Sequence, residues 1–158
     1  MGGNGRCISD RLGWYMRIIT EPKDTIGRYV SSKLTDGVEW TDFVAFGLVN
    51  KDDELMAGVV FNGYTHPAIC MHIAAEKMTP TFVAVVMDYA FRQLKCKRVT
   101  GVIDRHNKAS RRFAVHLGAK LEGVMREASL KGDVCIYGLL RKDAEQWLTP
   151  RYKQRLER

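Results

Sequence analysis

Long apolar runs are scarce in this chain of 158 residues. The longest such stretch, residues 82–91, is interrupted by Asp88 and is far shorter than the roughly 20 residues that cross a bilayer. The glycine-rich residues 1–6 are followed by no apolar segment of the kind found in secretion signals. We therefore expect a cytoplasmic protein without a membrane partner.

Paired cysteines are also missing. The four cysteines are far apart in the sequence, with no CxxC pair and no histidine at the spacing of a zinc site. We expect free, mostly buried thiols that serve as small hydrophobic residues, because free cysteine is among the most buried residue types. No metal site is expected. The cysteines concerned are Cys7, Cys70, Cys96 and Cys135.

Internal repeats, low-complexity segments and long linkers are absent from the sequence as well. With 46% hydrophobic residues, the chain can bury one core but is too short for two ordinary domains. We predict one domain over residues 1–158, with its most informative part at about 43–148 and a basic tail at about 149–158.

Charge is distributed unevenly along the chain, whose formal net charge is +7. Residues 1–91 hold 8 Lys and Arg against 11 Asp and Glu, a charge of −3, whereas residues 92–158 hold 17 against 7, a charge of +10. This asymmetry favours an anionic partner for the C-terminal half: a phosphorylated cofactor, a nucleic acid or an acidic protein surface. Nucleic acid is not favoured, because neither a known nucleic-acid-binding module nor regular alternation of basic and aromatic residues is present.

Alternating strand and helix patterns predict an α/β domain with a mixed sheet. Runs rich in β-forming residues predict strands at 14–20, 43–49, 54–61, 68–74, 99–103, 121–126 and 134–140. Helical spacing and helix-start signals predict helices at 25–34, 79–94 and 107–117, with a polar, basic helix from about Asp143. Gly118 is a natural residue to end the third helix. The segment 68–74 has little polar alternation, so we expect it in the middle of the sheet.

The segment 107–123, NKASRRFAVHLGAKLEG, carries the most specific pattern in the sequence. It resembles the GNAT family of acyl-CoA acyltransferases, especially ribosomal-protein N-terminal acetyltransferases, which read approximately Asn-x-Ala-Ser-x-Arg, Leu-Gly-Phe and Glu-Gly-Val-x-Arg. The matching residues are Asn107, Ala109, Ser110, Arg112, Leu117, Gly118, Glu122, Gly123, Val124 and Arg126. The segment 132–147 further resembles acetyltransferase-like proteins encoded by phages, which would place the chain in a host cytoplasm. The resemblance implies a mostly antiparallel central sheet flanked by helices, and acetyl-CoA (CoA) as the cofactor.

Two features of that family are lacking. The usual pyrophosphate loop, Gln/Arg-x-x-Gly-x-Gly/Ala, is replaced by the glycine-free residues 74–80, which approach a phosphate less closely. A helix N-terminus can still attract phosphate through its N–H groups and dipole, and Lys77 adds positive charge. The tyrosine that serves many members as general acid corresponds to Ala114 here, so that route for protonating the thiolate is closed.

The resemblance also implies a set of cofactor-binding residues. Asn107 would hydrogen-bond the pantetheine arm of CoA, or it only caps the helix that follows, a position that favours Asn. Backbone N–H groups around residues 72–74, where the fourth and fifth predicted strands would part, would polarise the thioester carbonyl. Basic residues between 95 and 112 would attract the phosphates, or they form a solvated face. The cofactor-binding set comprises His72, Ile73, Ala74, Lys77, Met78, Thr79, Asn107, Ser110 and Arg112.

Acyl transfer to an amine needs a base for the amine and an acid for the leaving thiolate. Ser110 occupies the position at which related N-terminal acetyltransferases place a thiolate-protonating serine, or it is simply a small polar residue of the first helical turn. His72 suits a general base by its near-neutral pKa, or it is a satisfied core histidine. Glu127 and Glu122 are rival bases, and Glu122 could equally accept a structural hydrogen bond.

Two functions are compatible with the sequence. The first is an N-acyltransferase that moves an acetyl group from acetyl-CoA to an amine by direct attack in a ternary complex. Its acceptor, a small molecule or a protein N-terminus or lysine, is not specified, and a homodimer is left open. The second is a noncatalytic GNAT-like phage structural or host-interaction protein, suggested by the missing glycine loop and tyrosine. An open cleft beside His72 and Asn107 would argue for the first function, and a plugged cleft for the second.

Overall fold

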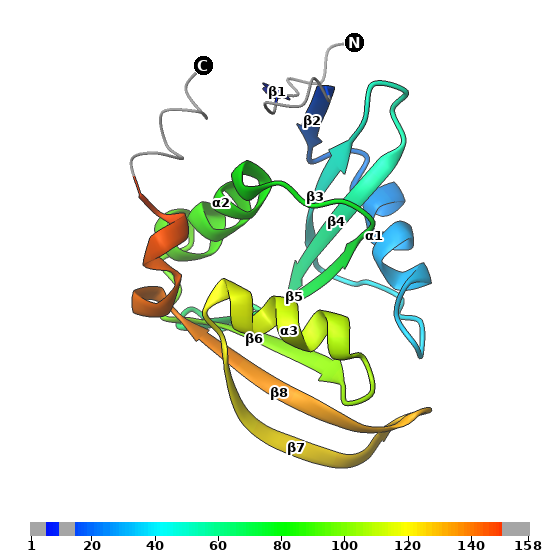
Figure 1. Cartoon of the computed structure of the whole chain (residues 1–158), viewed down its shortest axis with the longest axis vertical. Helices are drawn as coiled ribbons and strands as arrows, with labels where there is room; N and C mark the ends of the chain where they lie inside the picture. Colours follow the sequence, from blue (N-terminus) through cyan, green and yellow to red (C-terminus); the bar gives the residue numbers. More distant parts are fainter. Residues whose placement is uncertain (1–5, 10–14, 150–158) are drawn as a thin grey trace.

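A mixed sheet forms the centre of the molecule in the computed structural model, which describes residues 6–9 and 15–149 (Figure 1). The described strands form one sheet in the order β1-β2-β3-β4-β5-β6-β8-β7. Among them, only the pair β5 and β6 is parallel, and this confirms the predicted mixed, mostly antiparallel α/β fold. The strands are β1 (Arg6–Ser9), β2 (Tyr15–Ile19), β3 (Val44–Val49), β4 (Leu55–Asn62), β5 (Ala68–Ala75), β6 (Arg98–Asp104), β7 (Lys120–Ser129) and β8 (Gly132–Leu140).

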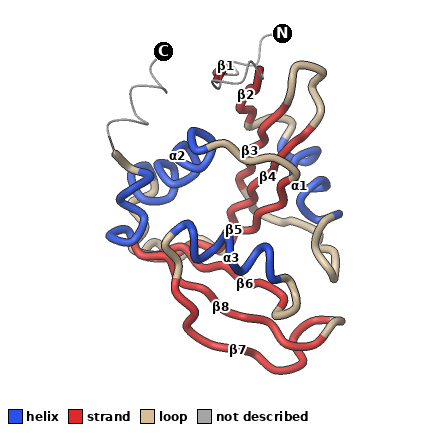
Figure 2. Tube along the Cα trace, in the orientation of Figure 1, coloured by secondary structure: helices blue, strands red, loops and turns tan. Residues whose placement is uncertain are grey.

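Helices cover both faces of the central strands. Figure 2 shows α1 on one side of β3 and β4, and α2 on the other side. Side chains alternate between the two faces along a strand, so on β4 Val59 packs in the core cluster that contains α2, and Val60 packs in the cluster that contains α1. The helical elements are α1 (Lys23–Ser32), α2 (Pro80–Asp88), a π-helical turn η1 (Tyr89–Gln93), α3 (Lys108–Leu117) and a 3₁₀ segment η2 (Arg141–Trp147).

The ends of α2 and α3 follow the predicted capping signals. Thr79 Oγ1 accepts a hydrogen bond of 3.2 Å from Phe82 N, and Pro80 occupies the first turn of α2. Gly118 ends α3 in the left-handed region with φ of 106°. A Cβ atom at this position would lie 2.3 Å from the Asp143 carbonyl oxygen, so any other residue would have to displace the backbone of η2.

Three predicted elements differ in detail from the structure, and β1 was not predicted. The predicted helix 79–94 divides into α2 and η1, and β7 continues beyond residue 126 because it pairs with β8 up to Ser129 and Gly132, which flank the turn at residues 130–131. The helix expected from about Asp143 is a 3₁₀ segment that begins at Arg141. Trp14 and residues 150–158, which include most of the predicted basic tail, lie outside the described residues.

Cys70, Cys96 and Cys135 are free thiols; Cys96 and Cys135 are buried and Cys70 is half-buried, in agreement with their predicted role as small hydrophobic residues. The side chain of Cys7 is outside the described part. Across residues 15–149, no helix combines the length and the apolar character needed to cross a membrane.

Candidate functional site

The sheet opens between β5 and β6, near the middle of the strand order. Their parallel pairing covers three residue pairs and ends at Cys70 with Thr100. Beyond this point β5 continues to pair with β4 up to Ala75, and β6 continues to pair with β8 up to Asp104. Each strand therefore follows its antiparallel partner, whose pairing is more stable per residue than the short parallel one. The divergence leaves an opening between two strands of one sheet.

Backbone polar groups of β5 face this opening. Pro67 O accepts from Lys97 N and Arg98 N on the β6 side of the strand, whereas Glu76 N donates to Met56 O on the β4 side. The N–H and C=O groups of successive residues point to alternate sides of a strand, so the odd-numbered residues of β5 direct their N–H and C=O groups toward β6. Beyond the end of the parallel pairing, the backbone groups that face the opening are therefore those of Met71, Ile73 and Ala75.

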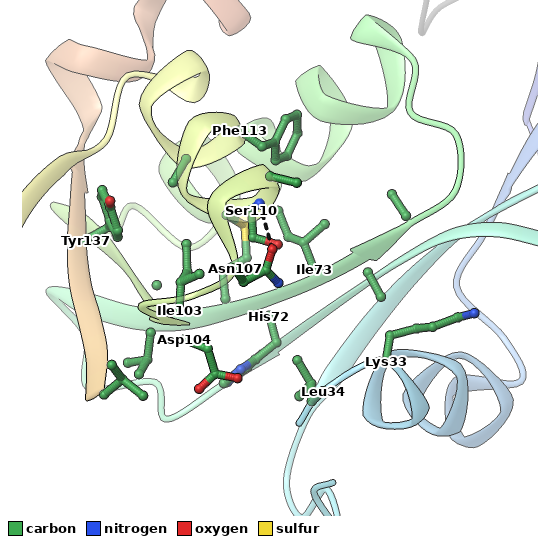
Figure 3. A pocket seen from close by; sticks show the side chains of 18 of the residues that line it. Lys33, Leu34, His72, Ile73, Ile103, Asp104, Asn107, Ser110, Phe113 and Tyr137 are labelled. Carbon is green, nitrogen blue, oxygen red and sulfur yellow. Dashed lines mark hydrogen bonds between the residues drawn. The ribbon is translucent and has the colours of Figure 1, made fainter. Parts of the chain in front are cut away.

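A cavity of about 730 Å³ occupies the opening (Figure 3). Side chains from both faces of the sheet line it: Ile73 belongs to the α2 side of β5, and His72 belongs to the α1 side. The cavity thus passes through the sheet. On one side it is lined by the start of α3, with Asn107 and Ser110, and on the other side by the segment 33–38, which follows α1. Two reactants entering from opposite faces can meet in such a passage.

His72 points from β5 toward the α1 side of the cavity. Its Nε2 donates to Asn62 Oδ1 at 3.1 Å, which leaves Nδ1 as the unprotonated nitrogen. The ring packs against Trp40 with a centroid distance of 4.8 Å, and Trp40 Nε1 in turn donates to Gly27 O at 2.8 Å. Burial lowers the pKa of His72 below its ordinary value of 6.5, because the charged imidazolium loses hydration. The side chain is therefore a neutral, oriented imidazole at the cavity wall.

Asn107 and Ser110 stand at the start of α3 (Figure 3). The Asn107 side chain caps the helix, since its Oδ1 accepts from Ser110 N at 3.1 Å. The cap occupies one lone pair of this oxygen, and no described bond engages the Nδ2 amide group, which can donate to a molecule in the cavity. Both residues line the cavity, so the capping role and a binding role for Asn107 are compatible.

Seven of the predicted site residues line the cavity: His72, Ile73, Ala74, Lys77, Met78, Asn107 and Ser110. The other three lie outside its lining. Thr79 is buried as the cap of α2, and Arg112 is exposed on α3. Glu127 is exposed on β7, with φ of 51°, and its backbone N donates to Asp133 Oδ1 at 3.1 Å. Glu122, the rival base, forms an ion pair of 2.6 Å with Arg98, the structural alternative considered for it.

In the segment between β5 and α2, which replaces the family's glycine-rich pyrophosphate loop, backbone N–H groups are bonded within the protein. The N–H groups of Glu76 and Lys77 both donate to Met56 O, at 2.8 and 3.0 Å, which ties the end of β5 to β4. Phe82 N is used by the Thr79 cap. These three amides are committed to the fold, so phosphate groups at this helix end would rely on other donors, such as the Lys77 ammonium group.

Sequence reasoning missed the wall on the α1 side of the cavity. Thr35 Oγ1 donates to Asp104 Oδ2, and Leu130 N donates to Asp36 Oδ1 at 3.0 Å, so the segment 33–38 reaches across to β6 and to the β7–β8 turn. These partners are separated by 69 and 94 residues, and no local pattern in the sequence indicates such contacts. The one available signal was the position of Asp104 at the end of a predicted strand.

Asp104 is a carboxylate on the β6 side of this wall, where it accepts from Thr35. Burial raises the pKa of its carboxyl group, but hydrogen bonds from Thr35 and Ser129, with the nearby charges of His106 and Lys131, bring the pKa below its ordinary value. Asp104 is thus an anion at neutral pH beside the same cavity as His72.

Several basic residues of the predicted cluster also hold the framework of α3 together. Arg111 Nε donates to Tyr137 OH at 3.2 Å and its Nη1 donates to Arg105 O at 3.0 Å, which ties α3 to β8 and to the loop before it. Arg105 itself forms an ion pair of 2.9 Å with Asp133. Lys108 and Arg112 are exposed on α3 and add positive charge to its first turns.

A family model described as an acetyltransferase (GNAT) domain matches residues 9–120 of this sequence. Comparison of the sequence with curated proteins gives no significant match.

Acetyltransferases are among the solved structures that share this fold. A single-site mutant of the spermidine N-acetyltransferase SpeG from Vibrio cholerae has a TM-score of 0.66 and 14% identity, covering 86% of this chain and 98% of its own. A spermidine N-acetyltransferase from Vibrio cholerae in complex with CoA and spermine has a TM-score of 0.65 and 14% identity, covering 82% and 98%. A putative acetyltransferase from T. thermophilus has a TM-score of 0.64 and 19% identity, covering 99% and 98%.

Proposed function

The chain belongs to the GNAT acetyltransferase family, and we propose that it is an N-acetyltransferase that moves an acetyl group from acetyl-CoA to an amine by direct attack in a ternary complex. The observation that carries this proposal is the open cavity between the parted strands β5 and β6, lined by His72 and Asn107. A noncatalytic protein would have no need to keep this passage clear of side chains.

The residues around the opening fit a pantetheine arm. Ile73 and Ala75 present backbone N–H and C=O groups along an open strand edge, which can pair with the amide groups of an extended ligand as a neighbouring strand would. Asn107 Nδ2 supplies a further donor from α3, and Ser110 lies one turn along the same helix. Acetyl-CoA, when bound, supplies an acetyl group activated as a thioester.

The chain's own groups then divide the work of acyl transfer. Ile73 N–H faces the opening and polarises the thioester carbonyl, a task for a preorganised backbone donor. His72, held neutral by burial, takes the proton from the attacking amine, directly or through a water molecule. The Ser110 hydroxyl protonates the leaving sulfur and regains a proton from water, a task for which the Ala114 side chain has no group. The amine nitrogen gains a bond to the carbonyl carbon while the carbon–sulfur bond breaks.

The acceptor enters from the α1 side, where His72 and Asp104 line the cavity. Asp104 is an anion beside this entrance and attracts a protonated amine. The related structure solved with CoA and spermine makes a polyamine the first acceptor to test. We propose a cationic amine as the acceptor class.

A thiol-release assay with acetyl-CoA and spermidine, extended to a panel of primary amines, tests the proposal. Release of CoA should depend on both reactants, and the His72→Gln variant should lose about 10²-fold or more in kcat, the usual contribution of a general base. His66→Asn is the matched control, because His66 is an exposed histidine outside the cavity lining, with a φ of 75° that Asn tolerates. Equal losses in the two variants would contradict a role for His72.

A further inference from the structure

The cavity extends beyond the opening into the space beneath α3. Its deep part, here called the inner recess, is lined mainly by hydrocarbon side chains, and the one hydroxyl beside it, that of Tyr137 opposite Gly101, already accepts a hydrogen bond from Arg111 Nε. Val99, Leu117 and Leu139 are at most 3% exposed, so the inner recess lies within the protein core. The inner recess is lined by Val99 and Gly101 of β6, Ala114 and Leu117 of α3, Ala119, and Tyr137 and Leu139 of β8.

Two small residues keep the inner recess open. Side chains alternate along β6, and Val99 and Ile103 pack in the clusters that hold Leu117 and Ala114, so Gly101 between them also faces α3. A Cβ atom at Gly101 would meet no atom within 4 Å, and its φ lies outside the left-handed region that requires glycine. Ala114 lines the same cavity from α3, at the position where the family places its tyrosine. The missing side chains at these two positions create the space.

We infer that the inner recess accommodates a hydrocarbon chain and that the preferred donor carries a linear acyl group longer than acetyl. This inference rests on the proposed function. The mainly apolar lining, whose Tyr137 hydroxyl is bonded to Arg111, offers few partners to a protonated amine or to the amide groups of pantetheine, whose burial without hydrogen bonds is costly. A hydrocarbon has no such cost, and each methylene transferred from water to an apolar site strengthens binding by about fourfold.

The reaction is unchanged by the length of the chain. The amine nitrogen bonds to the carbonyl carbon of the acyl thioester, the carbon–sulfur bond breaks, and the sulfur leaves as a thiolate that takes up a proton. No oxidant or reductant is needed.

Steady-state kinetics with acetyl-CoA, butyryl-CoA and hexanoyl-CoA, at one fixed amine concentration, tests the inference. The wild-type protein should show kcat/KM for butyryl-CoA about tenfold above that for acetyl-CoA. The Gly101→Val variant, which fills the inner recess, should lose the preference for the longer donors, so that kcat/KM no longer rises from acetyl-CoA to butyryl-CoA. Gly101→Ala, with a smaller side chain, should lose hexanoyl-CoA activity first and provides the second variant if valine prevents folding.

Gly123→Val is the matched control. Gly123 lies on β7 outside the cavity lining, and a Cβ atom there also meets no atom within 4 Å, so valine adds the same side chain without touching the inner recess. This control should keep the wild-type preference. A wild-type kcat/KM that falls from acetyl to butyryl would overturn the inference and leave the proposed function standing. An unchanged chain-length preference in Gly101→Val would also overturn it. Failure to use any acyl-CoA would overturn both.

Discussion

His72 owes its candidate role to two neighbours and to burial rather than to its place in the sequence. Asn62 binds the Nε2 nitrogen, Trp40 packs against the ring in a tilted arrangement, and burial disfavours the charged form. An imidazole that stays neutral below the usual histidine pKa can accept a proton over a wider pH range. This arrangement suits a base that faces a positively charged acceptor, which would otherwise meet a like charge.

A pH profile of kcat/KM should report this property. Because the folded pKa of His72 is lowered below 6.5, the acidic limb should have its midpoint below pH 6.5, and it should be missing in His72→Gln. The unfolded chain takes up the proton first, so the free energy of unfolding should fall as the pH drops through about 6.5. An acidic limb retained in His72→Gln would assign the base to another group.

Asp104 can be tested separately as a group that recognises the acceptor. Asp104→Asn removes the negative charge and should raise KM for spermidine by about tenfold or more, since charge-assisted contacts contribute about 1.5–3 kcal/mol. The KM for acetyl-CoA should stay constant. Thr35→Ala is the control, because it removes the Thr35–Asp104 hydrogen bond and keeps the charge. Equal increases in KM for spermidine in both variants would show that the contact matters only for structure.

At the scale of elements, the start of α3 combines a structural and a binding function in one side chain. Asn107→Ala loses the cap and should lower the free energy of unfolding by about 1 kcal/mol, together with the affinity for CoA. Asn107→Ser keeps a capping oxygen but has no amide donor. Thermal denaturation should therefore be near wild type for Asn107→Ser, while calorimetry shows weakened CoA binding. Wild-type affinity in Asn107→Ser would leave Asn107 as a cap only.

The close approach of α1 to the segment that follows it depends on Gly27. A Cβ atom there would lie 2.9 Å from Trp40 and 3.2 Å from Phe43, so the helical position has no room for a larger residue. Gly27→Ala raises helix propensity, yet overpacking costs typically about 1–3 kcal/mol and should dominate. We expect a lower melting temperature, and reduced activity because Trp40 also contacts His72. A higher melting temperature would show that Trp40 moves aside without cost.

The sequence predicted those elements whose signals are local. The Thr79-Pro80 start of α2, the Gly118 end of α3 and the central place of the strand at residues 68–74 depend on neighbours in the chain. The wall formed by Thr35 and Asp104 was not predicted, because it joins residues 69 positions apart through tertiary contact. The length of the parallel β5–β6 pairing, which sets the size of the opening, likewise depends on competition between strand pairs.

At the scale of the whole molecule, both the charge distribution and the position of the cavity are compatible with the proposed anionic cofactor. The residues from 92 onward carry the positive excess, and within them α3 presents Lys108 and Arg112 at the surface near the cavity. The opening between β5 and β6 is lined from both faces of the sheet, so the proposed anionic cofactor on the α3 side and the proposed cationic amine on the α1 side would use different entrances. The backbone amides of residues 76 and 77 donate to Met56 O on β4, so we expect them to contribute little to phosphate binding, and the affinity for the cofactor is the quantity to measure.

Titration calorimetry with acetyl-CoA is the most direct test that this cavity is the cofactor site. Ser110→Trp places a large side chain at the cavity lining, whereas Val115→Trp places the same side chain on α3 at a position that is 60% exposed and outside the lining. We predict a dissociation constant between about 1 μM and 1 mM for the wild type and for Val115→Trp, within the usual range of enzyme affinities for substrates. Ser110→Trp should show no binding heat. Absence of binding by the folded wild type up to millimolar acetyl-CoA, or full binding by Ser110→Trp, would contradict the account.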